Sequence, residues 1–180
     1  MGDSRLFITF AATLLVITGQ WAQCQSAPKQ KEQRVFSAED ENVNHPVAIP
    51  AEVMALLAKN EDVRNVLEYE KVEPSNLPAS WFSAAEVRLG NKSERDLIIA
   101  SKGPLRGANI DPFWVFIHDS KGFKLALSIS LHDLVVKRTR SHGYRDLELS
   151  GMTASIVTVG KFRFDGNAYR ESSEKTTDIK

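Results

Sequence analysis

The stretch from Asp111 to Ser130 constrains the fold more than any other part of this 180-residue chain. It reads DPFWVFIHDSKGFKLALSIS, two apolar runs separated by a polar turn at 119–122. Every residue of 113–117 is apolar, which is typical of a strand covered on both faces. In the return run, apolar residues at alternate positions indicate one buried face of a pleated strand: Phe123, Leu125, Leu127, Ile129 and Leu131. The stretch therefore predicts a central β-hairpin, and it carries no catalytic motif.

More strands are predicted on both sides of this hairpin. Apolar runs at 81–89 and 97–101 precede it, and shorter runs follow it at 134–137, 147–149 and 155–159. A last hairpin is expected at 161–170, where Asp165-Gly166 supplies the backbone conformation that a tight turn requires.

Two short helices are predicted before the strands. Pro50 suits a first helical turn, and Asn60 separates the two helical patterns. Apolar residues recur at helical spacing on one face of each helix: Val53, Leu56, Leu57, Val63, Val66 and Leu67. We expect this face to pack on the protein's own sheet, and a protein-binding helix is the alternative.

The predicted fold is α+β. A short N-terminal helical hairpin packs on a twisted antiparallel β-sheet of about six to eight strands. Residues 47–170 form a single domain in this prediction. The polar segment 25–46 is expected to be a disordered linker, and the polar segment 171–180 a disordered tail.

Residues 1–24 are predicted to be a signal peptide. The run from Leu6 to Ile17 has no charge and is too short to span a bilayer. Small residues at Ala22 and Cys24 suit cleavage after Cys24, so a secreted or periplasmic protein without a later transmembrane segment is expected. Lipoprotein anchoring through Cys24 is the alternative. Cys24 is the only cysteine, so cleavage after it would leave no disulfide, thiolate metal site or cysteine nucleophile.

The overall formal charge is zero, but the two halves differ. Residues 25–90 hold seven cations and eleven anions, a net of −4, whereas residues 91–180 hold fifteen and eleven, a net of +4. A nucleic-acid partner would call for a larger basic excess, so none is expected.

A short motif occurs twice. Arg95-Asp96-Leu97 is repeated fifty residues later as Arg145-Asp146-Leu147. In both copies a polar turn meets an apolar run. An Asp at such a junction commonly accepts hydrogen bonds from the turn's backbone amides, so the repeat is interpreted as architectural.

Four histidines offer candidate chemistry, and two of them precede an aspartate. His118-Asp119 and His132-Asp133 would form a zinc or acid–base site if the two ends of the hairpin converged, because a carboxylate orients an imidazole and raises its basicity. Water-exposed turn residues are the alternative. The common serine-hydrolase motif and the glycine-rich phosphate loop are both missing.

A basic run in the C-terminal half offers a candidate binding surface. Basic side chains beside an aromatic ring can hold an anionic surface, and the flexible loop 102–109 contributes a further arginine. The candidate ligand-binding residues are Arg106, Lys137, Arg138, Arg140, Tyr144 and Arg145. A solvated strand end is the alternative.

Two resemblances follow from motifs. Residues 87–98 resemble a degenerate calcium loop of the FG-GAP type, in which Asp96 matches the pattern. Arg88, Gly90 and Lys92 stand where that loop has oxygen ligands, so we expect no calcium and no other cofactor. The run of motifs PFWVF, GYRDLEL and FRFDGNAY, over about residues 81–170, resembles uncharacterised secreted bacterial β-rich proteins with a closing FRFDG hairpin. That resemblance implies no particular activity.

The sequence therefore predicts an exported, non-catalytic binding or inhibitory module that contacts an unknown protein or an anionic surface. The alternative is a small secreted hydrolase that uses the two His-Asp pairs. The sequence does not identify the ligand or the oligomeric state.

We expect the exported protein to begin at or near Gln25, because the apolar run ends at Ile17 and the small residues follow it. Intact-mass analysis of the exported material tests this. A mass that retains residues 6–17, or one that carries acyl chains on Cys24, contradicts it.

Overall fold

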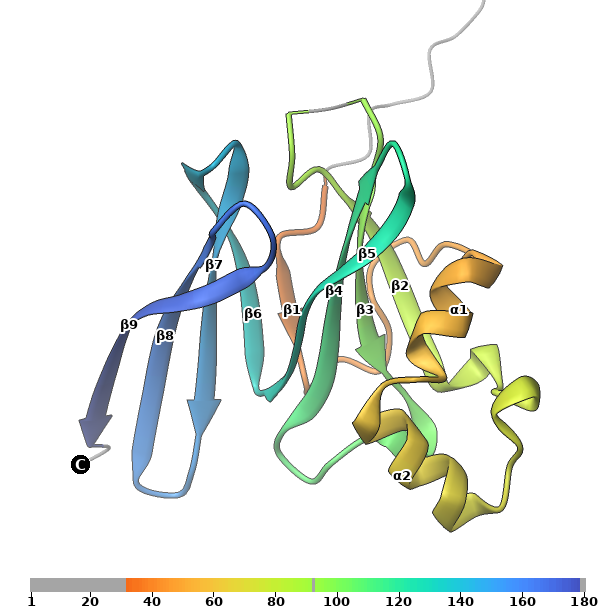
Figure 1. The fold of residues 1–180 in the computed structure, drawn as a ribbon. Coiled ribbons are helices and arrows are strands. Elements are labelled where there is room, and N and C mark those ends of the chain that lie inside the picture. Colours follow the sequence, from red (N-terminus) through yellow and green to blue (C-terminus); the bar gives the residue numbers. More distant parts are fainter. Residues whose placement is uncertain (1–31, 92, 179–180) are drawn as a thin grey trace, which may run out of the picture. The chain divides into compact units, whose positions relative to one another are not determined.

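A computed structural model describes residues 32–91 and 93–178, and these are mostly β (Figure 1). The described strands form two antiparallel sheets, with the order β1-β6-β7-β8-β9 in the larger and β2-β3-β4-β5 in the smaller. Two α-helices accompany them. The elements are β1 (Val35–Ser37), α1 (Ala51–Leu57), α2 (Glu61–Glu70), β2 (Phe82–Val87), β3 (Asp96–Ser101), β4 (Asp111–Asp119), β5 (Gly122–Leu131), β6 (Asp133–Ser141), β7 (Tyr144–Met152), β8 (Ile156–Phe164) and β9 (Tyr169–Asp178).

The broad α+β class is confirmed, but the prediction of one sheet with six to eight strands is wrong. The nine strands of residues 32–91 and 93–178 are divided between two sheets of five and four. The chain changes sheets between β5 and β6, at His132. The backbone of His132 is held there by its N–H donating to Ser150 and its carbonyl accepting from Ala38. Strand patterns in a sequence show which residues are extended, but they do not show which strands pair.

The smaller sheet is covered on both faces. In β4, Phe113 and Val115 belong to the core between the two sheets. Trp114 and Phe116 point the other way and belong to the core under the helices. All four side chains are fully buried, which confirms the prediction of a central strand. The helices complete this second core with Val53, Leu57, Val63 and Leu67.

The partner strand β5 differs from the prediction of one buried face. A register shift opposite Val115 and Phe116 leaves Ala126 without a partner on β4. Leu125 therefore packs in the core under the helices, whereas Leu127 packs against the core between the sheets. The extra residue of a bulge moves the following side chains to the other face, because side chains alternate with a period of two.

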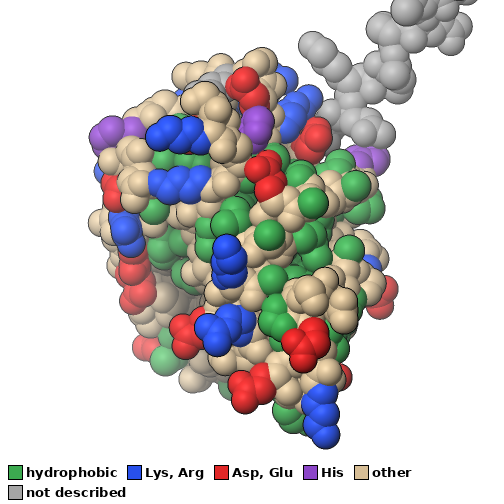
Figure 2. All heavy atoms as spheres, turned by 45° about the vertical axis from the view of Figure 1, so that its right-hand side comes forward, with side chains coloured by type: hydrophobic (Ala, Val, Ile, Leu, Met, Phe, Trp, Pro, Cys, Tyr) green, Lys and Arg blue, Asp and Glu red, His purple; other side chains and the backbone are tan. Residues whose placement is uncertain are grey.

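The space-filling view with the helical side brought forward shows how that side meets solvent (Figure 2). Hydrophobic, basic and acidic side chains are interspersed over it, and neither charge sign dominates. This face therefore offers no strongly charged patch for a partner.

The segments 25–46 and 171–180 are predicted to be disordered, but most of their described residues are ordered. Residues 1–24, which are predicted to be a signal peptide, lie outside the described part, as does the start of the segment 25–46. From residue 32 that segment is ordered, because β1 pairs with β6 and Phe36 is buried in the core with 1% of its surface exposed. A few apolar residues are enough to order such a segment when a partner strand is already in place for it to pair with.

The C-terminal segment is also ordered as far as Asp178. β9 pairs with β8 through Asp178, although every side chain after Tyr169 is exposed. Backbone hydrogen bonds rather than apolar burial hold this edge strand, so its polar composition did not reveal it.

Asp96 fixes the connection between β2 and β3. Its Oδ2 accepts from the backbone N–H groups of Leu89 at 2.9 Å and Gly90 at 3.0 Å, and its Oδ1 accepts from the N–H of His118 at 3.0 Å. Burial raises the pKa of Asp96, and these amide hydrogen bonds offset part of that rise. In the second copy of the motif, Oδ1 of Asp146 is buried without a hydrogen-bond partner among the described residues.

The two copies of the motif should respond differently to the same substitution. Asp96→Asn should lower the free energy of unfolding by about 1–3 kcal/mol, because an amide has only one acceptor oxygen for three backbone donors. Asp146→Asn should cost less than about 1 kcal/mol, because no comparable set of donors is lost. Urea denaturation of both variants measures this, and equal losses would contradict the structural role given to Asp96.

Candidate functional site

One end of the sandwich is hollowed. The hollow has a volume of about 380 Å³, within the range of roughly 300–1,000 Å³ that small-ligand sites occupy. Its walls come from the residues after β1, the loop between β3 and β4, the link between β5 and β6, and the turn between β7 and β8. They are Ala38, Glu39, Arg106, Ala108, Asn109, His132, Met152, Thr153 and Ala154.

Arg106 is fixed at this hollow by the loop that carries it. Its Nε donates to Oδ2 of Asp111 at 2.8 Å, and its guanidinium also donates to the carbonyl of Ala38. The other oxygen of Asp111 accepts from the N–H of Gly107 at 2.8 Å. A Cβ at Gly107 would collide with the carbonyl oxygen of Ile110, so the tight turn requires glycine here. The side chain of Asp111 is 4% exposed and that of Arg106 is 30% exposed, which leaves part of the guanidinium facing solvent.

His132 also lines the hollow, and it lies between two carboxylates. Its Nδ1 is 3.1 Å from Oδ2 of Asp133, and its Nε2 is 3.6 Å from Oε1 of Glu39. Burial alone would raise the pKa of Asp133, but hydrogen bonds from Ser37, His132 and Ser150 bring it below its usual value. Its contribution to stability is therefore present above the unfolded pKa and is lost as the pH falls through the lower folded pKa.

Exposed apolar side chains gather around the same end. Ile110 in the loop before β4 is 41% exposed, and Met152 and Ile156, which flank the turn between β7 and β8, are 41% and 36% exposed. They are three of the five large apolar side chains that the described residues expose; the other two are Val35 and Tyr69. An apolar rim around a partly polar hollow is typical of an interaction site.

Three of the predicted ligand-binding residues lie at the other end of the sandwich. Arg140 donates through Nη1 to the carbonyl of Leu89 at 2.8 Å, and Arg145 pairs with Glu32 at 3.0 Å. The ring of Tyr144 lies against Gly90, close enough that a Cβ there would meet it at 3.2 Å. These side chains hold the connection between β2 and β3, and they do not form one surface with Arg106.

The remaining predicted residues, Lys137 and Arg138, lie on β6. Lys137 pairs with Glu148 at 3.0 Å on the neighbouring strand. Arg138 is exposed and makes no ion pair with a described residue. Neither residue belongs to the hollow.

The two His-Asp pairs do not meet. His118 is opposite Phe123 at one end of β5, and His132 follows Leu131 at the other end. Eight residues of strand separate these ends, about 26 Å at roughly 3.3 Å per residue. The imidazole of His118 packs on the ring of Phe123 with 4.5 Å between centroids. The acid–base site that the hydrolase alternative requires is therefore not assembled.

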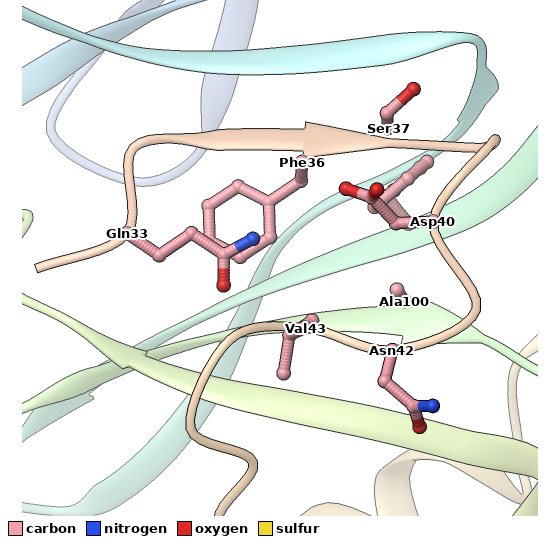
Figure 3. A pocket seen from close by; sticks show the side chains of 8 residues that line it. Gln33, Phe36, Ser37, Asp40, Asn42, Val43 and Ala100 are labelled. Carbon is pink, nitrogen blue, oxygen red and sulfur yellow. The ribbon is translucent and has the colours of Figure 1, made fainter.

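A second, much smaller cavity lies beside β1 (Figure 3). Its volume is about 10 Å³, close to the minimum of roughly 10–15 Å³ that one water molecule needs. It is lined by Gln33, Phe36, Ser37, Asp40, Asn42, Val43, Ala100 and Phe113. This cavity is too small for a ligand.

Within residues 32–91 and 93–178, no group of three or more His, Cys, Asp or Glu side chains is arranged to hold a metal ion. No helix in this part of the chain combines the length and the apolar character needed to cross a membrane.

The sequence analysis identified Arg106 and the pair His132-Asp133 but missed the apolar rim. The available signal was the run from Met152 to Ile156, in which apolar residues flank a turn of small residues. Whether these apolar side chains are exposed depends on how the neighbouring strands pack. The sequence pattern alone therefore indicated only the start of another strand.

No family model matches the chain, and no significant similarity to a curated protein or to a solved structure was found.

The Arg106–Asp111 pair should stabilise this end of the sandwich. Arg106→Ala should lower the free energy of unfolding by about 2–3 kcal/mol, because it leaves the buried carboxylate of Asp111 without its cationic partner. Arg138→Ala is the matched control and should change stability by less than about 0.5 kcal/mol. Thermal and urea unfolding compare the two, and equal effects would contradict the anchoring role of Arg106.

Proposed function

We propose that this protein is an exported, non-catalytic binding module that contacts a partner protein through the hollow end of its β-sandwich. The surface consists of the hollow together with Ile110, Met152 and Ile156, and is called the loop-end surface below. An inhibitory module is the special case in which the partner is an enzyme.

The observation that carries the proposal is the clustering of exposed apolar side chains around the hollow. Ile110 comes from the loop before β4, and Met152 and Ile156 from the ends of β7 and β8 that flank a turn; the fold brings them to the same end. Burying such side chains in an interface gains about 25 cal/mol per Å² of apolar surface. Isolated apolar residues on a surface are common, but a cluster beside a hollow favours an interface.

The hollow suggests the chemistry of the contact. Ala38, Ala108 and Ala154 have short side chains, which leave room for an apolar side chain of the partner. The solvent-facing part of the Arg106 guanidinium lies at the same wall and suits a carboxylate beside that side chain. An anchor residue in a pocket with a charged contact at its edge is a common source of binding energy in protein interfaces.

The arrangement of His132 supports binding rather than catalysis. Both of its ring nitrogens face carboxylates, those of Asp133 and Glu39. In this position it links the start of β6 to the residues after β1. The neighbouring Thr153 hydroxyl bonds within its own turn, to the backbone of Ile156 at 3.2 Å. These groups stabilise the walls of the hollow.

Replacing the apolar rim should abolish partner binding without unfolding the protein. The double variant Met152→Asp, Ile156→Asp places charges where an interface would be buried, and surface substitutions cost only about 0.5 kcal/mol each. The amount of partner bound should fall at least tenfold. To measure this, the wild type and the double variant are each used to capture partners from the exported proteins of the producing cells, and the captured proteins are compared.

Tyr69→Asp is the matched control, because Tyr69 is an exposed apolar side chain on α2 that does not line the hollow. Proteins captured by the wild type and by Tyr69→Asp but lost with the double variant support the proposal. If every captured protein is retained by the double variant, or is lost equally with Tyr69→Asp, the loop-end surface is not the interface.

A further inference from the structure

A further recess, distinct from the hollow and from the small cavity beside β1, lies between the free edge of the smaller sheet and the inner face of the larger one. Its volume is about 230 Å³. β5 packs against β7 of the larger sheet, so the next strands of that sheet, β8 and β9, extend beyond β5 and leave the recess open. This groove is lined by Ile129, Ser130, Leu131, Leu149, Ser150, Gly151, Thr158, Gly160, Phe162, Glu171 and Glu174.

The groove is closed at one end of the strands and open along the rest. Phe164 and Tyr169 are buried in the core near the turn between β8 and β9. At the same turn Lys124 of β5 donates a hydrogen bond to the side chain of Asn167. Farther along the strands the lining includes Gly151 and Gly160, which have no side chains to fill the space between the two sheets.

One wall of the groove is an edge strand. β5 pairs only with β4, and no other backbone hydrogen bond of residues 122–131 is made within the described part of the chain. The backbone N–H and C=O groups on the other side of β5 therefore lack a strand partner. An exposed edge of this kind can accept an added strand.

The opposite wall carries two carboxylates. Glu171 leans over the floor, since its Oε1 is 3.4 Å from the position that a Cβ on Gly160 would occupy. Glu174 lies on the same wall, opposite Gly160 in the strand register. Neither carboxylate forms an ion pair with a described Lys, Arg or His. The groove thus combines an apolar floor around Phe162, a free strand edge and negative charge.

We propose that this groove binds an extended peptide segment that carries lysine or arginine side chains. The segment pairs with the free edge of β5 through its backbone. Its side chains alternate, so those on one face contact Leu131, Leu149 and Phe162 while basic groups reach Glu171 and Glu174. Such a segment belongs to another polypeptide, and the site is separate from the loop-end surface.

The test uses a fluorescein-labelled, capped peptide of alternating threonine and lysine, titrated with the full chain. A matched peptide with glutamate in place of lysine is the charge control. We expect only the lysine peptide to bind, and its binding should weaken severalfold as the salt concentration rises from about 0.05 to 0.3 M. Equal binding of both peptides, or of neither, overturns the proposal.

Two variants locate the binding. Glu171→Gln with Glu174→Gln removes both charges and should weaken binding at least tenfold. Glu61→Gln with Asp62→Asn removes two exposed charges on α2 and should leave the affinity unchanged. If the two double variants weaken binding to the same extent, the attraction is a general effect of net charge and the proposal is wrong.

A third variant tests the shape of the groove. A Cβ at Gly151 would meet no atom within 4 Å, so Gly151→Leu fills the open space without a clash at its Cβ. It should abolish peptide binding while circular dichroism stays unchanged, and retained binding overturns the proposal. Sedimentation of the protein alone is the remaining check, because a dimer that Gly151→Leu converts to a monomer would identify a second copy of the chain as the occupant instead.

Discussion

Burial of the smaller sheet on both faces is the constraint on which the rest of the structure depends. Phe113 and Val115 need the larger sheet as cover, while Trp114 and Phe116 need the helices. Each fully buried aromatic or aliphatic side chain contributes about 1.5–3 kcal/mol, so neither cover can be lost without a large part of the usual stability margin. The helices and the larger sheet are therefore both parts of one folding unit.

The two ends of the sandwich are built differently, and this difference bears on function. At one end Asp96 and Arg140 bind the backbone of the β2–β3 connection, so the charged groups there serve the fold. At the other end the chain changes sheets and leaves a hollow with Arg106 on its wall. Loops on a rigid sandwich commonly carry binding residues, and the hollow end leaves apolar side chains exposed around a cavity.

The strands of the larger sheet that extend beyond β5 create a second kind of surface. The loop-end surface is apolar with a cation at its wall, whereas the groove beside β5 has two carboxylates. These surfaces suit different partners, a folded protein at the first and an extended basic segment at the second. The proposed loop-end interface and the groove are formed by different residues, so each can be tested while the other is intact.

The sequence by itself determined the local structure, because the period of apolar residues depends only on neighbouring positions. It predicted the β4–β5 hairpin, both helices and the tight turn at Asp165-Gly166, where Gly166 has a φ of 101°. It also named Arg106 as a candidate binding residue and His132-Asp133 as half of a candidate acid–base site. Arg106 and His132 do line the hollow, but the acid–base site is not assembled. It failed where a segment is ordered by distant partners, as for β1 and β9.

The tertiary structure alone decided which strands pair, which residues share a site and which side chains are free. His118 and His132 looked equivalent in sequence, yet they lie at opposite ends of β5. Arg140 and Arg145 looked like a binding patch, yet they are bound by a backbone carbonyl and by Glu32. The physical reason is that pairing between strands joins residues far apart in the chain, and a hydrogen bond or ion pair depends on distance in space rather than on spacing along the sequence.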